Sequence, residues 1–401
     1  MTTHTADHTD VRATNLAVVL RFLRTNAPCS RAAIAAGTGL NKATVTSIVG
    51  DLIDRRLTKE TQQTQNHVGR PATLLVLDGS AYAAIGMEVS ALGLTAIAYD
   101  SAGGQLLRWH RAGPGADASP AKTVAALAAL ARRAIAAVHS SGRDVLGLTV
   151  GVPGLVNRDG AVVLAAGLGW RDVELRKDLV AALSRPAFPV MVDNDANLGA
   201  LAEHRYGPHA GSANLIQLSG DTGVGAGVIC DGHPLRGNLG YAGEIGHLRI
   251  KPDGPLCGCG RRGCLEALAG IPAILARLDA SDLPDADPQA RTEQLVRRAE
   301  AGEVDTINML TEVGTLLGQS VCVLANVLNP ELVVLGGSYA ALGRWLVPAV
   351  EKELIDGALA PEAGGCQVVV STFGHDATSI GAVARSLDRF DSGRLPVNQT
   401  T

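Results

Sequence analysis

Residues 243–266 read GEIGHLRIKPDGPLCGCGRRGCLE, and this stretch constrains the fold of the chain more than any other. It places His247, Cys257, Cys259 and Cys264 within 18 residues. One imidazole and three thiolates suit tetrahedral Zn²⁺, and a Cys₃His set leaves no coordination position for water, which is typical of structural zinc. The sequence therefore predicts one structural zinc ion per chain, which holds this loop still.

Glycines separate the cysteines of this loop, at positions Gly258, Gly260 and Gly263. Glycine lets a backbone fold tightly around an ion, because it has no Cβ atom. The alternative interpretation is three ordinary reduced thiols near a surface histidine. A Cys-x-Cys pair with a third cysteine soon after it is rare by chance, so the spacing favours the metal.

The composition indicates a large protein of the cytoplasm. The chain has 401 residues, 46% of them hydrophobic, which is enough for two or three domain-sized cores. Seven cysteines are an odd number in so long a chain, unlike the disulfide frameworks of small secreted domains. We expect neither a secretory leader nor a membrane span, since the longest apolar run, residues 124–139, is interrupted by Arg132 and Arg133.

Charge is unevenly distributed along the chain. The net charge is −4 overall, whereas residues 1–80 hold nine Lys/Arg and six Asp/Glu, a net +3, which leaves −7 for the remainder. A basic N-terminal segment is compatible with binding to nucleic acid.

This N-terminal segment carries the pattern of a helix-turn-helix. A first helix is predicted by apolar residues at helical spacing, namely Leu16, Val19, Leu20 and Leu23. Ser30 and Asn41 suit the N-caps of two further helices, and Gly39 suits the turn between them. On the last helix, one face is apolar: Val45, Ile48, Val49 and Leu52.

The opposite face of that helix is small and hydroxyl-bearing, which allows a helix to lie deep in the DNA major groove. The residues that we expect to contact DNA there are Lys42, Ala43, Thr44, Thr46 and Ser47. After Leu57, two short strands flank a polar tip, as in the wing of a winged helix, and Arg70 in the tip can reach a phosphate or the minor groove. Residues 1–80 are therefore predicted to form a winged helix-turn-helix DNA-binding domain. The alternative is a small helical dimerisation unit.

From about residue 81, β-rich segments alternate with helical ones. The β-rich segments form two sets, residues 83–90, 93–100 and 144–154, then 212–220, 223–230 and 331–337. Two β-β-helix-β halves predict two related α/β lobes, with ligands bound outside the carboxyl ends of the strands. Residues 280–293 are polar and contain proline, so we expect a surface loop there.

Six motifs occur in the order seen in the ROK family of repressors and sugar kinases: GVPGLV, GLGW, VDNDAN, GVGAGV, AGEIGH and CGCGRRGCLE. The chain resembles this family over residues 83–388, and its front segment resembles the winged helix of the repressor branch. The resemblance implies a two-lobed sugar kinase/actin-like (ribonuclease H-like) domain over residues 81–401.

The resemblance also implies a sugar site. The positions that contact sugar in the family match Asn194, Asp195, Glu244, His247 and Glu266, and the family's zinc ligands match the four residues named above. His247 would bind zinc with one ring nitrogen and a sugar hydroxyl with the other. Asp195 matches the catalytic base of the kinases, which takes a proton from a sugar hydroxyl. Considered without the resemblance, Glu244 and Glu266 could equally be solvated charges on a loop. Residues 194–197 could equally form an ordinary turn.

One kinase motif is altered. The kinase branch has an acidic residue followed by Gly-Gly-Thr at its first hairpin, where backbone N–H groups approach the nucleotide phosphates. Here Glu88 is followed by Ser90, Ala91 and Leu92, whose side chains block that approach. The second phosphate loop, residues 220–225, remains rich in glycine. Half a phosphate cradle predicts no catalysis, because phosphoryl transfer depends on positioning, and Asp195 would then be a vestigial base.

The sequence thus predicts a cytoplasmic, sugar-responsive transcriptional repressor of genes for carbohydrate uptake or catabolism. The expected partners are a palindromic operator, a sugar or sugar-phosphate effector, and further copies of the chain in a homodimer or homotetramer. Two alternatives stay open, an active ATP-dependent sugar kinase with a DNA-binding appendage, and a regulator controlled mainly by a protein partner. The identity of the sugar and the sign of its effect on DNA binding also stay open.

Overall fold

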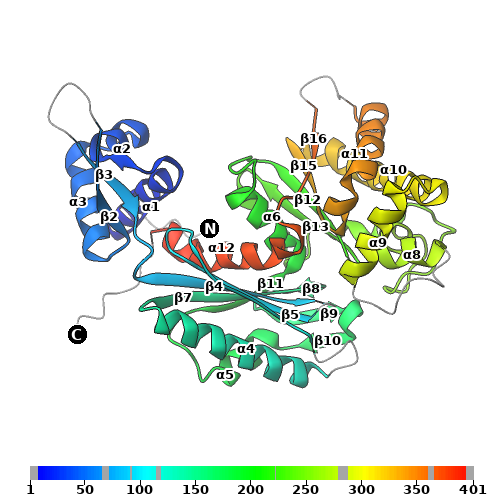
Figure 1. Cartoon of the computed structure of the whole chain (residues 1–401), viewed down its shortest axis with the longest axis horizontal. Coiled ribbons are helices and arrows are strands. Elements are labelled where there is room, and N and C mark those ends of the chain that lie inside the picture. Colours follow the sequence, from blue (N-terminus) through cyan, green and yellow to red (C-terminus); the bar gives the residue numbers. More distant parts are fainter. Residues whose placement is uncertain are drawn as a thin grey trace.

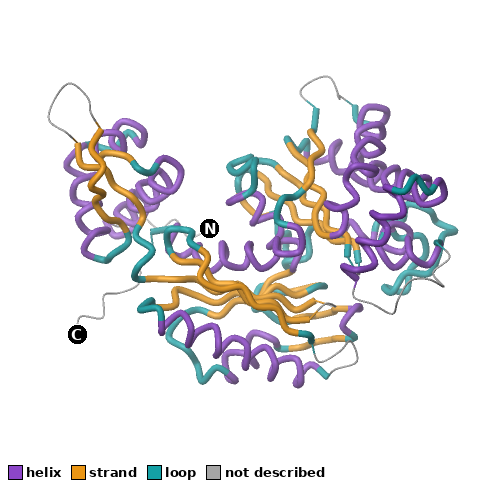
Figure 2. Tube along the Cα trace, in the orientation of Figure 1, coloured by secondary structure: helices purple, strands orange, loops and turns teal. Residues whose placement is uncertain are grey.

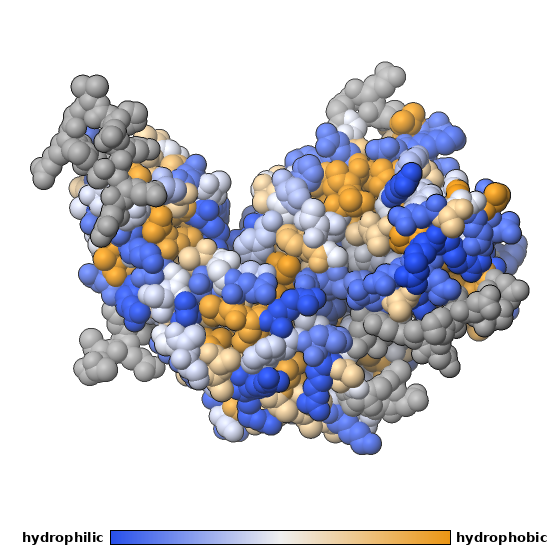
Figure 3. All heavy atoms as spheres, viewed as in Figure 1, coloured by the Kyte–Doolittle hydropathy of each residue, from blue (hydrophilic) through white to orange (hydrophobic). Residues whose placement is uncertain are grey.

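The computed structural model describes residues 8–65, 72–90, 93–113, 119–221, 223–278, 288–359 and 365–393. A small N-terminal unit, blue in Figure 1, stands beside two larger α/β lobes. The space-filling view shows an open notch between the N-terminal unit and the second lobe, above the first lobe (Figure 3). The predicted α/β class with a separate N-terminal unit is confirmed.

The N-terminal unit begins with three helices, α1 (His8–Asn26), α2 (Arg31–Thr38) and α3 (Lys42–Asp54). Both predicted N-caps are confirmed, because the Ser30 side chain accepts a hydrogen bond from the backbone N–H of Ala33 and that of Asn41 accepts one from Thr44. Gly39 ends α2 with a φ of 71°, a left-handed conformation that glycine adopts without strain. These local signals produce the turn between α2 and α3.

Helix α3 has one buried and one open face. Its buried residues are the predicted ones, Val45, Ile48, Val49 and Leu52. They pack with apolar residues of α1 in the core of the N-terminal unit. The opposite face reaches solvent, with exposed side chains at Lys42, Ala43, Thr46 and Ser47 and a half-buried one at Thr44. The residues expected to contact DNA therefore lie on an accessible helix face.

A hairpin completes the N-terminal unit. Strands β2 (Thr58–Gln65) and β3 (Ala72–Leu77) pair antiparallel, and the short β1 (Cys29–Ser30) pairs with the other edge of β3. The predicted pair of strands is confirmed. Arg70, in the expected wing tip, lies outside the described residues.

Two five-stranded sheets form the two lobes (Figure 2). The sheet of the first lobe has the order β11-β7-β4-β5-β6 and consists of β4 (Tyr82–Ser90), β5 (Gly93–Asp100), β6 (Gln105–Arg111), β7 (Asp144–Val152) and β11 (Val190–Asn194). The sheet of the second lobe has the order β16-β15-β12-β13-β14 and consists of β12 (Leu215–Gly220), β13 (Val224–Cys230), β14 (His233–Pro234), β15 (Leu332–Gly337) and β16 (Gln367–Val370). The two orders match strand for strand, which confirms the predicted pair of related lobes.

Helices cover the outer face of each lobe. In the first lobe these are α4 (Pro120–Ser140) and α5 (Leu175–Ala182), beside a small sheet of β8 (Leu155–Val156), β9 (Val162–Ala165) and β10 (Trp170–Val173). In the second lobe they are α7 (Leu265–Ala269), α8 (Ile271–Arg277), α9 (Pro288–Glu300), α10 (Val304–Leu328) and α11 (Ser338–Gly357). The surface loop expected over residues 280–293 is wrong from Pro288 onward, because α9 starts there and buries Thr292 and Leu295.

Helix α10 is long and apolar enough to cross a membrane by length and composition. It packs against α11, and 44% of its most apolar stretch is buried inside the chain. Leu310, Val313 and Leu317 from this helix are fully buried in the core of the second lobe. We therefore interpret α10 as a core helix.

Two helices are exchanged between the lobes. Helix α6 (Asp195–Tyr206) follows β11 of the first lobe but packs against β12 and β13 of the second. Helix α12 (Ala377–Asp391) follows β16 of the second lobe but packs against β4 and β7 of the first. The two helices also pack against each other, and α12 lies above the first-lobe sheet in Figure 1. The lobes are therefore joined through this helix pair.

Glycines allow the exchanged helices to approach their neighbours closely. A Cβ atom at Gly381 of α12 would lie 1.7 Å from the carbonyl oxygen of Leu198 in α6. A Cβ atom at Gly86 of β4 would lie 2.1 Å from the carbonyl oxygen of Ser379 in α12. Backbone meets backbone at both places, so these elements have no room for sliding or for larger residues.

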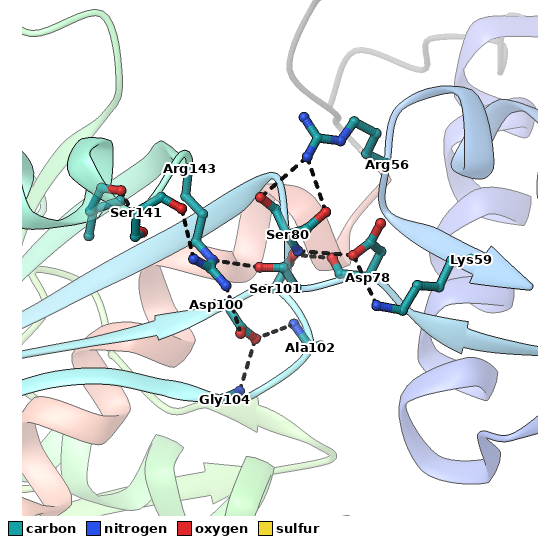
Figure 4. A network of polar contacts seen from close by, with 12 residues as sticks. Arg56, Lys59, Asp78, Ser80, Asp100, Ser101, Ala102, Gly104, Ser141 and Arg143 are labelled. Carbon is teal, nitrogen blue, oxygen red and sulfur yellow. Dashed lines mark hydrogen bonds and ion pairs between the residues drawn. The ribbon is translucent and has the colours of Figure 1, made fainter. Parts of the chain in front are cut away.

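The connector between the N-terminal unit and the first lobe, residues 78–81, is held from both sides (Figure 4). Arg56, in the turn after α3, donates to the Ser80 hydroxyl at 3.2 Å. From the first lobe, Arg143 donates to the Gly79 carbonyl at 2.6 Å. The N-terminal unit is thus anchored by polar contacts as well as by the chain itself.

The core of the N-terminal unit contains one residue from the other end of the chain. Phe390, near the end of α12, is only 2% exposed and packs among the apolar residues of α1, α2 and α3. Beside it, Arg24 of α1 donates to Asp391 of α12 at 2.8 Å. Helix α12 therefore extends from the interface between the lobes into the core of the N-terminal unit.

Replacing this aromatic side chain should loosen the N-terminal unit. We expect Phe390→Ala to lower the free energy of unfolding of that unit by about 3–5 kcal/mol, the usual range for a buried phenylalanine. Limited proteolysis with mass spectrometry would report cleavage between residues 8 and 80. The control variant Phe188→Ala, which removes a partly buried aromatic side chain packed against the first-lobe core, should not increase cleavage there. Unchanged protection of residues 8–80 in Phe390→Ala would contradict the shared core.

Candidate functional site

A cavity of about 400 Å³ lies between the lobes, at the carboxyl ends of β7, β11 and β12. It is lined by all five residues expected to contact sugar, Asn194, Asp195, Glu244, His247 and Glu266. The position agrees with the rule that ligands of open α/β sheets bind outside the carboxyl ends of the strands. The structure therefore brings the five residues together.

Asn194 and Asp195 occupy the junction between β11 and α6. The Asn194 side chain caps α6 by accepting from the backbone of Asn197 at 2.9 Å, and it donates to the Gly154 carbonyl at 3.0 Å. Asp195 Oδ1 accepts from the backbone of Ala196 at 2.8 Å and from the Asn194 amide at 3.0 Å. No donor among the described residues contacts Asp195 Oδ2, so this oxygen is available to a ligand.

The carboxyl group of Asp195 is electrostatically strained. Burial raises the pKa of Asp195 to about 6, and the nearby Asp221 carboxylate adds to the rise, while the hydrogen bond from Ala196 opposes it. Above this pKa the ionised carboxylate of Asp195 is desolvated in the folded protein and hydrated in the unfolded chain. Ionisation of Asp195 therefore lowers the stability of the folded protein.

The four residues expected to bind metal also meet. The ligand atoms of His247, Cys257, Cys259 and Cys264 all lie within 4.8 Å of one another. His247 Nδ1 lies 3.7 Å from the Cys257 sulfur, and the sulfurs of Cys259 and Cys264 are 3.7 Å apart. A disulfide would bring two sulfurs to about 2.05 Å, whereas a tetrahedral ion with metal–sulfur bonds of about 2.3 Å separates them by about 3.8 Å. The donor set thus fits a tetrahedral metal ion.

Two of the three glycines in this loop have the role expected from the sequence. Gly260 and Gly263 have φ values of 84° and 73°, and a Cβ at Gly263 would lie 1.5 Å from the Lys251 carbonyl oxygen. Gly258 is different, because its φ is not in the left-handed range and a Cβ there would meet open space. Of these three glycines, the tight folding of the loop therefore requires Gly260 and Gly263 and not Gly258.

The metal-binding loop is connected directly to the cavity. One carboxylate oxygen of Glu266 accepts from the backbone of Val224 at 3.3 Å, and the other lies 3.6 Å from the Cys257 sulfur. Because His247 directs Nδ1 toward Cys257, its Nε2 is the ring nitrogen left for a ligand in the cavity. Glu244 stands exposed at the start of the short helix η2 (Ile245–His247).

The cavity continues past Asp195 into a second compartment of about 310 Å³. Asp221, at the end of β12, lines it and accepts hydrogen bonds from the backbone N–H and the hydroxyl of Ser338 at 3.2 and 2.9 Å. Ser338 begins α11, so a carboxylate of the protein itself occupies the N-terminus of that helix. This contact was not predicted, since the glycine-rich loop 220–225 contains no sign of a partner 117 residues away.

The first hairpin borders the same compartment. Ser90, paired with Gly93 at the β4–β5 turn, lines it. Three residues of the two phosphate loops lie outside the described residues: Ala91 and Leu92 of the altered first hairpin, and Thr222 of the glycine-rich loop 220–225.

Comparison with known proteins identifies the family of the chain. The profile of the ROK family matches residues 84–388. The chain belongs to the ROK family. It is similar to the xylose repressor of Bacillus subtilis, with 29% identity over 96% of this chain and 98% of that protein, and to the DNA-binding transcriptional dual regulator NagC of Escherichia coli, with 31% identity over 93% and 92%. A glucokinase of Halalkalibacterium halodurans is 33% identical, but the match covers only 61% of this chain and 76% of the glucokinase.

Solved structures give the same division. A ROK family transcriptional regulator, described as a homolog of the Escherichia coli MLC protein, aligns with 96% of this chain and 98% of its own at a TM-score of 0.79 and 25% identity. A ROK family glucokinase from Streptomyces griseus aligns with 76% of this chain and 98% of its own at a TM-score of 0.64 and 26% identity. The predicted sugar kinase/actin-like fold is confirmed.

The strained carboxylate predicts a pH-dependent effect on stability. Because the folded pKa of Asp195 is about 6 against an ordinary 3.8, ionisation destabilises the folded state progressively through this window. We expect Asp195→Asn to be more stable than wild type, by a margin that grows by about 2 kcal/mol between about pH 4.5 and 7.5. Urea unfolding at several pH values would measure the margin. Asp159→Asn, on an exposed turn, should show no such growth, and a constant margin for Asp195→Asn would refute the assignment.

Proposed function

We infer that this protein is a sugar-responsive DNA-binding transcriptional regulator, a repressor that a sugar ligand releases from its operator. The observation that carries this inference is the extent of the similarity. Relatives named as repressors or transcriptional regulators align with 93–96% of the chain, which includes the N-terminal unit, whereas the glucokinases align with 61–76% of it. The genes under control would be those for uptake or catabolism of the sugar.

For DNA binding, we propose that α3 enters the major groove. Its open face carries the residues proposed to contact DNA, Lys42, Ala43, Thr44, Thr46 and Ser47. Small side chains permit a close approach of the helix to the base edges, and hydroxyls can bond to either bases or phosphates. Arg70 of the wing would add contact with a phosphate. Two copies of this unit in a dimer or tetramer would read a palindromic operator.

For sugar binding, we propose that Asn194, Asp195, Glu244, His247 and Glu266 contact hydroxyl groups of the ligand. Carboxylate and amide oxygens accept hydrogen bonds at defined angles, which suits an array of hydroxyls. The free Oδ2 of Asp195 and the Nε2 of His247 support these roles. The protein is proposed to act in the cytoplasm, with residues 1–80 as the DNA-binding domain and 81–401 as the sugar-binding domain.

We propose that the metal is one structural Zn²⁺ per chain, held by His247, Cys257, Cys259 and Cys264. A Cys₃His set supplies all four positions of a tetrahedral ion, so the zinc would shape the loop and carry out no chemistry on a substrate. Through Glu266 and His247, a loop fixed by zinc would also fix two of the proposed sugar contacts.

Phosphoryl transfer is the alternative activity, and two features of the second compartment oppose it. Ser90, Ala91 and Leu92 replace the Gly-Gly-Thr at which kinase backbone approaches the nucleotide. Asp221 places a negative charge at the N-terminus of α11, where a phosphate would otherwise find free N–H groups. We therefore propose that Asp195 binds sugar without acting as a base.

The exchanged helices offer a route from sugar to DNA. Asp195 is the first residue of α6, which packs against α12, and α12 ends in the core of the N-terminal unit. A chain of charges follows the same path, since Arg205 of α6 lies 3.3 Å from Asp388 and 3.2 Å from Asp391, and Asp391 pairs with Arg24. A sugar that binds two arrangements of the lobes unequally would shift the N-terminal units and weaken operator binding.

A direct test starts from a duplex that the protein itself selects from a random DNA pool. We expect the cognate sugar to release this duplex, and Asp195→Asn to need about 10-fold to 100-fold more sugar, because a charge-assisted hydrogen bond contributes about 1.5–3 kcal/mol. Fluorescence anisotropy would measure both quantities, and binding without sugar should be nearly unchanged in the variant.

Three further tests separate the alternatives. Thr46→Ala and Ser47→Ala should change the preferred bases, and unchanged preferences would remove α3 as the recognition helix. Steady formation of sugar phosphate from ATP by the wild type, lost in Asp195→Asn, would restore the kinase. Release of the duplex by a protein from the cell extract, with no effect of any sugar, would favour a protein partner as the effector.

Metal analysis tests the zinc assignment. We expect about one zinc per purified chain, and loss of both zinc and sugar response in Cys259→Ser, because three ligands no longer close the tetrahedron. Cys322→Ser, which removes a thiol from α10, should keep both. Operator binding without sugar should survive in Cys259→Ser. Stoichiometric sugar binding by fully zinc-free protein would show that zinc does not shape the cavity.

A further inference from the structure

Three helix N-termini surround the second compartment, and a carboxylate of the chain stands at each; at α6 and α11 it accepts a hydrogen bond from the helix backbone, and at α12 it does not. At α6, Asp195 Oδ1 accepts from the backbone of Ala196. At α11, Asp221 accepts from the backbone of Ser338. At α12, Asp376 stands at the N-cap position, and it lines the compartment together with Asp195 and Asp221. A helix N-terminus attracts an external anion through its free N–H groups and its dipole, but here the anion is internal.

The basic side chains of this compartment have partners as well. Arg108 donates to both carboxylate oxygens of Asp376, at 2.7 and 3.1 Å. His375 Nδ1 lies 3.4 Å from Asp221 Oδ1, and His110 Nδ1 lies 3.3 Å from a threonine hydroxyl. Each of the three therefore already directs part of its hydrogen-bonding capacity to a partner within the protein, which weakens its pull on an incoming phosphate.

Carboxyl groups are already crowded in this space. Burial raises the pKa of Glu88 well above its ordinary value, and repulsion from Asp195, Asp221 and Asp376 raises it further. Like charges brought together in a confined site weaken binding strongly. A phosphate dianion would add two more negative charges to a compartment that disfavours even its own carboxylates.

We propose that the cavity selects uncharged sugars and rejects the corresponding sugar phosphates, because Asp195, Asp221 and Asp376 occupy the positions that a phosphate would need. This inference rests on the proposed function, in which the ring lies in the first compartment and one hydroxyl reaches Asp195. A phosphate on that hydroxyl would project into the second compartment. Of the two effector classes left open by the sequence, sugar and sugar phosphate, the structure assigns the first.

One further cation, Arg261, lines the first compartment. It lies on the metal-binding loop, between Cys259 and Cys264. With Zn²⁺ bound, the three thiolates and the ion would carry a net charge of −1, which Arg261 would offset. It therefore belongs to the charge balance of the loop.

Matched ligand pairs test the proposal on the full-length zinc-loaded protein. Calorimetric titration would compare D-glucose, D-mannose and N-acetyl-D-glucosamine with their 6-phosphates, and D-xylose with its 5-phosphate. For every sugar that binds, we expect the phosphate to bind at least about tenfold more weakly, or 1.4 kcal/mol. A phosphate that binds as tightly as its free sugar would overturn the proposal and leave the sugar site standing. Absence of binding by the whole panel would instead count against the sugar site itself.

Two variants probe the cause of the selectivity. Asp221→Asn removes the charge at α11, and Asp376→Asn releases Arg108, so each should raise the affinity for phosphate relative to free sugar by about tenfold. Glu351→Gln removes one charge from an exposed position on α11 and should leave this ratio unchanged. Thermal unfolding would show which variants are folded. An unchanged ratio in folded Asp221→Asn and Asp376→Asn would overturn the proposal.

Discussion

The structure depends on the contact between α6 and α12, two helices that each pack on the sheet of the opposite lobe. Helix α12 meets both of its neighbours through backbone, because Gly381 admits the Leu198 carbonyl of α6, and Gly86 of β4 admits the Ser379 carbonyl of α12. Closely packed backbones transmit displacement, since no side chain lies between them to absorb it by changing rotamer. Asn194 and Asp195 lie at the start of α6. A displacement at these site residues is therefore passed through α6 and α12 to every element that α12 contacts.

The same fold carries kinases and regulators, and the second compartment shows how a small number of residues can separate the two activities. Asp195 and Asp221 accept hydrogen bonds from the N-termini of α6 and α11, and Asp376 stands at the N-cap position of α12. The same carboxylates of the protein both stabilise the helices and repel anions from the compartment. The protein thus keeps the framework of a nucleotide site while its electrostatics oppose nucleotide binding.

Local patterns predicted much of this molecule. The caps Ser30 and Asn41, the turn at Gly39 and the metal-binding loop all depend on residues close together in the chain, where spacing alone determines geometry. The sugar-site residues lie further apart, and only the family resemblance placed them together. Contacts such as Asp221 with Ser338, or Phe390 with α1, join segments with no shared pattern, so the sequence offered no signal. Helix α9 was missed at Pro288 because proline and polar residues suit a first helical turn as well as a loop.

The position of Phe390 bears on how such regulators diversify. A DNA-binding unit joined by the connector at residues 78–81 alone could be exchanged between proteins by a single crossover in the gene. Here Phe390 of α12 completes the hydrophobic core of that unit from the opposite end of the chain. A single crossover would therefore combine α1, α2 and α3 of one parent with α12 of the other. A working hybrid would need the last turns of α12 from the same parent as the N-terminal unit. Recombination, natural or engineered, must therefore preserve a pairing between the two ends of the protein.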